Sequence, residues 1–262
     1  MQLTVVGNRA GMPADGAASS GYLVQTEQSN ILLDCGPGIA VLLGNYLHPS
    51  HLDAVVITHL HMDHCYDVLP IGKQAMRKPV GAPDRRITLF VPAGARERLD
   101  RLAELFPVRT MPELNRAFDL AYDVVEYAPE TTYAVADCTV EFVPMAHSET
   151  DHGVRIVGPT GSLAFTGDTG WTDNLVRLAA DVDLFLAECT LAEPDRSEHG
   201  HLSAGEVGRA AAAAGARSVV LTHFGSPLPE WQQARRAEAA AEFGGPVTIA
   251  RPDMGFAVPA RR

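Results

Sequence analysis

The segment Thr58-His59-Leu60-His61-Met62-Asp63-His64 directly follows the apolar run Ala54–Ile57 and decides the expected fold. Three histidines and an aspartate lie within six positions, so they cannot all be buried as neutral packing groups. In a loop at the carboxyl end of a strand they can point inward together. Imidazole and carboxylate are ligands that zinc, manganese and iron(II) accept. We therefore predict a metal-binding loop here, in preference to a polar surface loop.

The pattern of an apolar strand followed by a histidine or an aspartate occurs three more times. A single histidine is more often a core or surface residue than a ligand, but chance does not easily produce this recurrence. The three further candidate ligands are His147, Asp168 and His223. The remaining histidines outside the site are predicted to be surface or loop residues: His48, His51, His152 and His199.

The chain has 262 residues, of which 46% are hydrophobic and 20% charged, as in an ordinary globular protein. We find no linker and no internal repeat, so residues 1–262 are treated as one domain. Strands are predicted at 2–6, 21–25, 30–34, 54–58, 87–91, 133–135, 139–144, 153–157, 162–166, 184–187, 218–222 and 247–250. Helices are predicted at 93–106, 172–180, 204–214 and up to 243. This order favours two packed sheets with helices outside.

Charge and composition limit the expected partners and location. The formal net charge of −11 at pH 7 argues against a surface that binds large nucleic acids non-specifically, but not against a small anionic substrate. No apolar stretch approaches the ~20 residues that span a bilayer, so no membrane partner is expected. The sequence starts without the pattern of a signal peptide, and its four cysteines are widely spaced. We expect a cytoplasmic protein with free, mostly buried cysteines.

The motifs together resemble the metallo-β-lactamase superfamily. H-x-H-x-D-H at 59–64, a distant His147, G-D-T at 167–169 and T-H at 222–223 follow the ligand order of that superfamily. The resemblance implies an α/β (α+β) fold, a four-layer αβ/βα sandwich of two mixed β-sheets with helices outside. It also implies two metal sites, one held by His59, His61 and His147, the other by Asp63, His64 and His223, with Asp168 bridging them.

Two divalent ions suit hydrolytic chemistry. Metals about 3.5–4 Å apart lower the pKa of a shared water, which becomes a hydroxide nucleophile. Zinc is the expected metal, with manganese and iron(II) as alternatives. Asp63 is counted among the catalytic residues as well as the ligands. Asp34, which ends the apolar run before Cys35, is interpreted as a carboxylate that orients a ligand histidine, the alternative being a turn-forming aspartate.

The later motifs resemble the ribonuclease-Z-like phosphodiesterases of the superfamily. They are Ala187-Glu188-Cys189-Thr190 and His199-Gly200-His201-Leu202-Ser203-Ala204. The resemblance implies that His201 protonates the leaving oxygen while Glu188 holds its ring. The alternative is that His201 merely precedes a helix and Glu188 pairs with a surface cation.

The interval between His147 and Asp168 bears on the substrate. Enzymes that process transfer RNA carry a long arm there, and this chain has no room for one. We therefore expect a small or cyclic phosphodiester, with a cyclic nucleotide among the candidates. A basic segment that includes Lys73 and Arg77 is either a substrate contact at the mouth of the site or a solvated surface; its other members are Lys78, Arg85 and Arg86. Trp171 either stacks on a substrate ring or packs in the core.

Three competing functions use the same fold. The first is an ester, lactone or thioester hydrolase with the same dinuclear site. The second is a redox di-iron protein, which the retained His61 argues against. The third is an inactive binding module, which the complete ligand set disfavours. By family resemblance alone we expect a homodimer.

Overall fold

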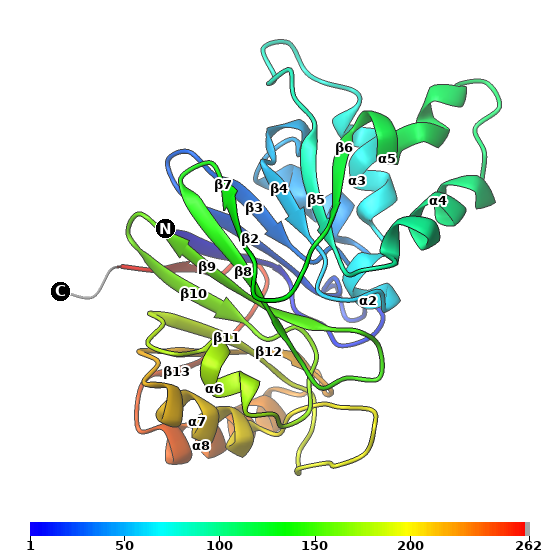
Figure 1. Cartoon of the computed structure of the whole chain (residues 1–262). Helices are drawn as coiled ribbons and strands as arrows, with labels where there is room; N and C mark the ends of the chain where they lie inside the picture. The colour runs from blue at the N-terminus through cyan, green and yellow to red at the C-terminus, as the bar shows by residue number, and fades with distance from the viewer. Residues whose placement is uncertain (260–262) are drawn as a thin grey trace.

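The computed structural model describes residues 1–259, so the last three positions of the predicted 1–262 domain lie outside the described residues. It contains two seven-stranded sheets (Figure 1). Sheet A has the order β14 (Gly255–Ala257), β1 (Gln2–Gly7), β2 (Gly21–Gln25), β3 (Asn30–Leu33), β4 (Ala54–Val56), β5 (Ile87–Val91), β6 (Tyr122–Glu126). Sheet B has the order β13 (Val247–Ile249), β12 (Val219–Phe224), β11 (Leu184–Cys189), β10 (Gly161–Phe165), β9 (His152–Gly158), β8 (Cys138–Pro144), β7 (Thr132–Val135).

Both sheets are mixed and built alike. In sheet A the strands from β3 to β6 are parallel and those from β14 to β3 antiparallel. In sheet B the strands from β10 to β13 are parallel and those from β7 to β10 antiparallel. Parallel strands bring their carboxyl ends to one edge of a sheet, where ligand-binding residues commonly gather.

Helices cover the outer face of each sheet (Figure 1). The short α2 (Met62–Cys65) lies in the predicted metal-binding loop. Sheet A carries α1 (Ile39–Leu42), α3 (Val68–Ala75), α4 (Ala95–Leu105) and α5 (Ala117–Leu120), with the 3₁₀ turns η1 (Leu43–Asn45), η2 (Pro49–His51) and η3 (Pro112–Arg116). Sheet B carries α6 (Asn174–Leu178), α7 (Ala204–Ala214) and α8 (Pro229–Phe243).

The alternation of side chains along the central strands explains the layers. On β4, Ala54 and Val56 face the core between the sheets, whereas Val55 faces the helices over sheet A. On β11, Leu186 faces the same central core, whereas Phe185 faces the helices over sheet B. Strands buried on both faces are continuously apolar, as these are. The predicted four-layer sandwich is confirmed.

Several details differ from the prediction. The strands β6 and β14 were not predicted, and the helix expected at 172–180 is limited to α6. His152 is buried and lies edge-on to Tyr127, so its assignment to the surface is wrong. Among residues 1–259, no helix is both long and apolar enough to cross a bilayer. All four cysteines are free, and three are buried.

The helix α7 begins and ends as the sequence predicts. Ser203 and Glu206 form a capping box at its start, and Gly215 ends it with a φ of 65°. Its Gly208 faces α8 so closely that an added Cβ would lie 2.4 Å from the Ala239 carbonyl oxygen. Gly205 of the same helix is open, because the nearest atom to an added Cβ lies 3.6 Å away.

We expect Gly208→Ala to destabilise the protein although alanine is the better helix former. The added methyl group forces α7 and α8 apart, which costs about 1–3 kcal/mol of unfolding free energy. Gly205→Ala is the matched control and leaves stability unchanged or raises it by up to about 1 kcal/mol. Urea unfolding of both variants measures this. Equal stabilities for the two variants would contradict the close packing of α7 on α8.

Candidate metal centre

The predicted metal-binding loop follows β4 and runs into α2. His59 and His61 lie before the helix, and Asp63 and His64 lie on it. His59 and His64 are fully buried, while His61 and Asp63 are half-buried. The backbone N–H of Gly11 donates a 2.8 Å hydrogen bond to Asp63 Oδ2, so the loop after β1 also fixes this carboxylate.

The structure brings all seven predicted ligands together. In two sets of residues, each residue offers one donor atom within 4.8 Å of the others. The first set is His59, His61, His147 and Asp168; the second is Asp63, His64, Asp168 and His223. Asp168 belongs to both, as the resemblance implied. That these groups bind metal stays a prediction.

The hydrogen bonds of the histidines show whether a cation fits. His64 Nδ1 lies 2.7 Å from Asp34 Oδ2, and His147 Nδ1 lies 2.9 Å from the Gly200 carbonyl oxygen. Because these oxygens can only accept, both Nδ1 atoms donate, and in its neutral form each ring presents its Nε2 lone pair to the centre. The Thr190 hydroxyl donates to the His223 carbonyl oxygen and therefore accepts from His223 Nδ1 at 2.9 Å.

With His64 and His223 both neutral, their Nε2 atoms face each other without a proton between them. His64 Nε2 and His223 Nε2 are 3.2 Å apart, and His61 Nδ1 and His147 Nε2 are 3.1 Å apart. His59 Nε2 and Asp168 Oδ1 are buried with no hydrogen-bond partner. Converging lone pairs on buried atoms are costly unless a cation lies between them. The donor set therefore fits divalent metal ions.

Two site residues have unusual backbone conformations. Asp34 has a φ of 55° and His223 a φ of 53°, a region that costs a non-glycine residue roughly 1 kcal/mol or more. The pairing of β11 with β12 shifts register between Glu188 and Cys189, so His223 is the extra residue of a bulge. A bulge redirects a side chain, which explains how a fully buried strand delivers a ligand to the centre.

Asp34 contacts one of the candidate ligand histidines, His64, as the sequence predicted. Besides the bond to His64, its carboxylate accepts hydrogen bonds from the Thr58 backbone N–H at 2.9 Å and the Thr58 hydroxyl at 3.0 Å. These contacts tie β3 to the metal-binding loop. A carboxylate behind a ligand histidine fixes the ring orientation and raises its basicity.

Asp151 makes the equivalent contact to His59 and was missed in the sequence. Its Oδ2 lies 2.7 Å from His59 Nδ1, and both side chains are fully buried. The Asp168 backbone N–H donates a 3.2 Å hydrogen bond to the same oxygen. Asp151 follows no apolar strand, because it lies in the turn between β8 and β9. Only its spacing of four from His147 was available as a signal, and that spacing has no fixed meaning in a turn.

The charges of the centre are strongly coupled. Burial lowers the pKa of His59 to about 3, and the neighbouring His64 adds to the effect. Burial opposes the ionisation of Asp168, but the charges of His223 and His64 outweigh it and hold its pKa well below the usual value. Burial, followed by the charge of Asp168, raises the pKa of Asp151 well above its usual value.

Glu188 and His201 form a hydrogen-bonded pair at the edge of the centre. His201 Nδ1 lies 2.8 Å from Glu188 Oε1, and both residues are buried. Glu188 Oε1 also accepts from the Thr169 backbone N–H at 3.0 Å, and its Oε2 accepts from the Thr190 N–H at 3.0 Å. Burial disfavours a charged His201, but the hydrogen bond and charge of Glu188 outweigh it and raise the pKa of His201 to about 9.

The basic segment does not border the centre. Arg85 pairs with Asp53 at 2.6 Å, and these residues precede β5 and β4, at the opposite ends of the strands from the ligands. Arg86 pairs with Asp123, and Lys78 pairs with Asp84. Lys73 lies on α3, which packs against η2 and α5, and Arg77 contacts the Met111 sulfur at 3.8 Å. Of the two alternatives for this segment, these contacts favour a solvated surface with ordinary salt bridges over a substrate contact.

The stretch 107–126 belongs to sheet A and to the helices that cover it. It forms η3, α5 and β6, and it buries Leu114 and Phe118 on the sheet A side. Of the histidines assigned to the surface, His48 and His51 are half-buried near η2. His199 is exposed but lies edge-on to His201, with ring centroids 4.8 Å apart.

We expect Asp151→Asn to weaken metal binding about 10- to 100-fold, because His59 loses the carboxylate that orients it. The affinity for only one of the two metal ions falls, since Asp34 still orients His64. Competition with a chromogenic chelator measures the affinity of each step. Glu149→Gln is the matched control, because Glu149 lies in the same turn and pairs with the exposed Arg98, at 3.3 Å. Equal metal affinity in both variants would contradict the role of Asp151.

Comparison with known proteins agrees with this geometry. Residues 29–224 match the family model described as a beta-lactamase superfamily domain. The chain is 30% identical to the probable metallo-hydrolase YhfI of Bacillus subtilis, over 96% of this chain and 97% of YhfI. The crystal structure of YhfI superposes with a TM-score of 0.83, covering 97% of this chain and 98% of that one, at 27% identity.

A ribonuclease Z of Thermobifida fusca is similar over its length as well. It is 30% identical over 315 aligned positions that cover all of this chain and 96% of the relative. The family match over most of the chain, the similarity to YhfI and the convergent donor groups lead to one conclusion. This chain belongs to the beta-lactamase superfamily, among its metallo-hydrolases.

Proposed function

We propose that this protein is a phosphodiesterase that hydrolyses a small or cyclic phosphodiester with two divalent metal ions, zinc in the first place and manganese or iron(II) as alternatives. The observation that carries the proposal is the buried pair of Glu188 and His201 beside the metal-binding residues. His201 Nδ1 lies 4.0 Å from Asp168 Oδ2, so its ring borders the residue shared by both donor sets. When bound, the metals supply an activated water and neutralise charge on the phosphoryl oxygens.

The chain's own residues account for the departure of the leaving group. Glu188 accepts the Nδ1 proton of His201 and is itself held by two backbone N–H groups. The ring is thereby fixed with Nε2 free to donate a proton. An alkoxide is a poor leaving group, and a positioned acid that protonates it contributes typically 10²–10⁴-fold. Acyl hydrolysis of an activated ester needs this assistance less, which is why the pair favours a phosphodiester.

The same residues form a third group of donors. Glu188, His201 and His223 offer atoms within 4.8 Å of one another, as the two candidate metal sites do. The direct 2.8 Å hydrogen bond between Glu188 and His201 favours a proton-holding role over a ligand role. The two interpretations differ in metal content, because a ligand role predicts loss of metal when His201 is removed.

The short connection between His147 and Asp168 supports a small substrate. It consists of a turn, β9, a tight hairpin and β10, with no protruding segment. The aligned ribonuclease Z extends over 315 positions, so that relative has stretches that this chain lacks. Together with the net charge of −11, this favours a small phosphodiester over transfer RNA. A homodimer and a cytoplasmic location stay predictions.

We expect His201→Ala to lower kcat about 10²–10⁴-fold for a phosphodiester with an alkoxide leaving group. The loss is much smaller with 4-nitrophenolate, which leaves without a proton. Metal content stays at the wild-type value. Steady-state kinetics on the two substrates and elemental analysis of the variant test this.

His199→Ala is the matched control, because His199 is the exposed neighbour of His201 and its ring makes no hydrogen bond or ion pair with a carboxylate among residues 1–259. It is expected to lose less than about tenfold of activity, below the range for a positioned acid. Full activity of His201→Ala on the alkyl phosphodiester would contradict the acid role and favour an ester, lactone or thioester as substrate. Loss of metal from His201→Ala would instead make His201 a ligand.

A further inference from the structure

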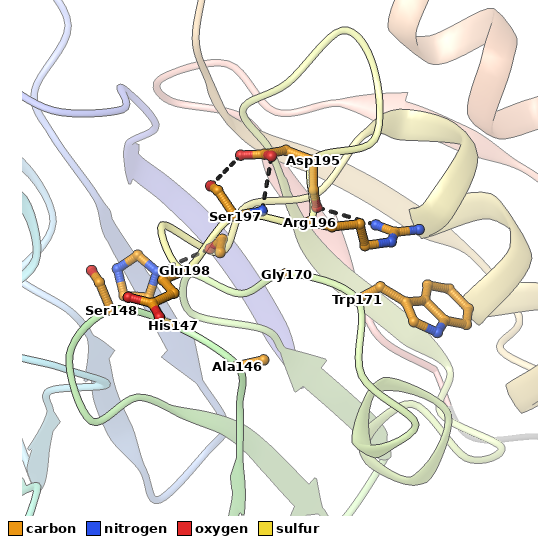
Figure 2. Close-up of a pocket in the computed structure, with 10 residues that line it drawn as sticks. Ala146, His147, Ser148, Gly170, Trp171, Asp195, Arg196, Ser197 and Glu198 are labelled. Atoms are coloured by element: carbon orange, nitrogen blue, oxygen red, sulfur yellow. Dashed lines mark hydrogen bonds between the residues drawn. The ribbon is translucent and has the colours of Figure 1, made fainter.

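A pocket of about 500 Å³ lies beside His147 (Figure 2). Three segments line it: 146–148 after β8, Gly170 and Trp171 after the bridging aspartate, and residues from 195 to 200 in the loop before α7. His147 belongs both to this pocket and to the first set of metal-binding candidates. A substrate whose phosphate lies at the metal centre therefore extends into this space, which we call the His147–Trp171 pocket.

The pocket carries excess negative charge. Its one cation, Arg196, is paired with the buried carboxylate of Glu206 on α7. The Asp195 carboxylate accepts hydrogen bonds from the Ser197 backbone and hydroxyl. Glu198 has no hydrogen-bond or ion-pair partner among residues 1–259, so its carboxylate is free to accept from a ligand. Because Glu206 already neutralises Arg196, the carboxylates of Asp195 and Glu198 leave the pocket negatively charged. The pocket therefore repels a second phosphate and favours a neutral group with N–H or O–H donors.

Trp171 lines the side of the pocket away from His147, as Figure 2 shows. Its indole is half-buried, packs against the core under α7 and has the Arg209 guanidinium 5.9 Å from its ring centroid. The preceding residue is fixed, because the Gly170 N–H donates a 2.7 Å hydrogen bond to the Ala146 carbonyl oxygen. A fixed aromatic ring stacks on planar groups with little loss of conformational entropy.

We propose that the His147–Trp171 pocket binds a neutral planar ring that carries hydrogen-bond donors, such as the amino-bearing base of a mononucleotide, and that it excludes a second phosphate. The inference rests on the proposed function, since the phosphoester at the metal centre is what anchors the ring. It narrows the substrate from any small phosphodiester to one with a single phosphate and a planar base. The Glu198 carboxylate accepts hydrogen bonds from the ring's donors, and the ring stacks on Trp171.

Tryptophan fluorescence tests the ring site directly. The chain has two tryptophans, so Trp231→Phe leaves Trp171 as the only reporter. We expect AMP to quench the fluorescence of this zinc-loaded variant and to bind at least about fivefold more tightly than ribose 5-phosphate, which carries the same phosphate without the base. Equal affinity for the two compounds, or no quenching by AMP, would overturn the proposal.

Glu198→Gln tests whether the negative charge of the pocket excludes a second phosphate, and Glu198 is exposed, so the core is unchanged. Adenosine 3′,5′-bisphosphate is expected to bind the wild-type protein more weakly than AMP, because its second phosphate meets Glu198. In Glu198→Gln we expect the affinities for AMP and for the bisphosphate to lie closer together. Glu193→Gln is the matched control, since Glu193 is exposed in the same loop and does not line the pocket. Tighter binding of the bisphosphate to the wild type, or equal effects of both variants, would overturn the exclusion of a second phosphate.

Failure of this inference and failure of the proposed function give different results. Hydrolysis of bis(4-nitrophenyl) phosphate is measured on the same zinc-loaded preparation. Turnover without any preference for AMP over ribose 5-phosphate overturns the ring site alone. If AMP quenches the fluorescence and binds preferentially but no phosphodiester is hydrolysed, the ring site is supported and the proposed phosphodiesterase function is overturned.

Discussion

The organising constraint in this molecule is the convergence of histidine lone pairs in a buried space. Asp34, the Gly200 carbonyl and Thr190 each accept the Nδ1 proton of one histidine, which fixes that ring in one tautomer. With both rings neutral, His64 Nε2 and His223 Nε2 then meet at 3.2 Å without a proton between them, and His147 Nε2 lies 3.1 Å from His61 Nδ1. Such an arrangement is unfavourable in a protein interior unless cations balance it. The family relationship and the local chemistry therefore point to the same requirement.

The fold meets this requirement by bringing two similar sheets together. Each sheet contributes candidate metal ligands from the carboxyl ends of its strands, so the centre depends on how the sheets pack. The bulge at His223 and the positive φ of Asp34 are local costs, and the buried strands around them hold both in place. Asp34 and Asp151 act from opposite sheets on His64 and His59. The orienting carboxylates are thus as much a part of the design as the ligands.

The sequence predicted most of the fold, because strands buried on both faces are continuously apolar and end at recognisable turns. It also predicted which residues converge at the centre, since each follows such a strand or ends it. Asp151 was missed because it lies in a turn, where no periodicity indicates which way a side chain points. The sequence left the place of the basic segment open, because clustering along the chain does not show which end of a strand it borders. Arg85 pairs with Asp53 at the end of the strands away from the candidate ligands. His152 was assigned to the surface, but it is the first residue of β9 and is buried against Tyr127.

The most direct test of the account is metal-dependent hydrolysis of a chromogenic phosphodiester by protein stripped of metal. The account predicts that turnover returns on adding zinc or manganese, saturates near two equivalents per chain, and collapses in Asp168→Ala, which removes the residue common to both donor sets. Protein that binds two equivalents and hydrolyses no phosphodiester would contradict the account.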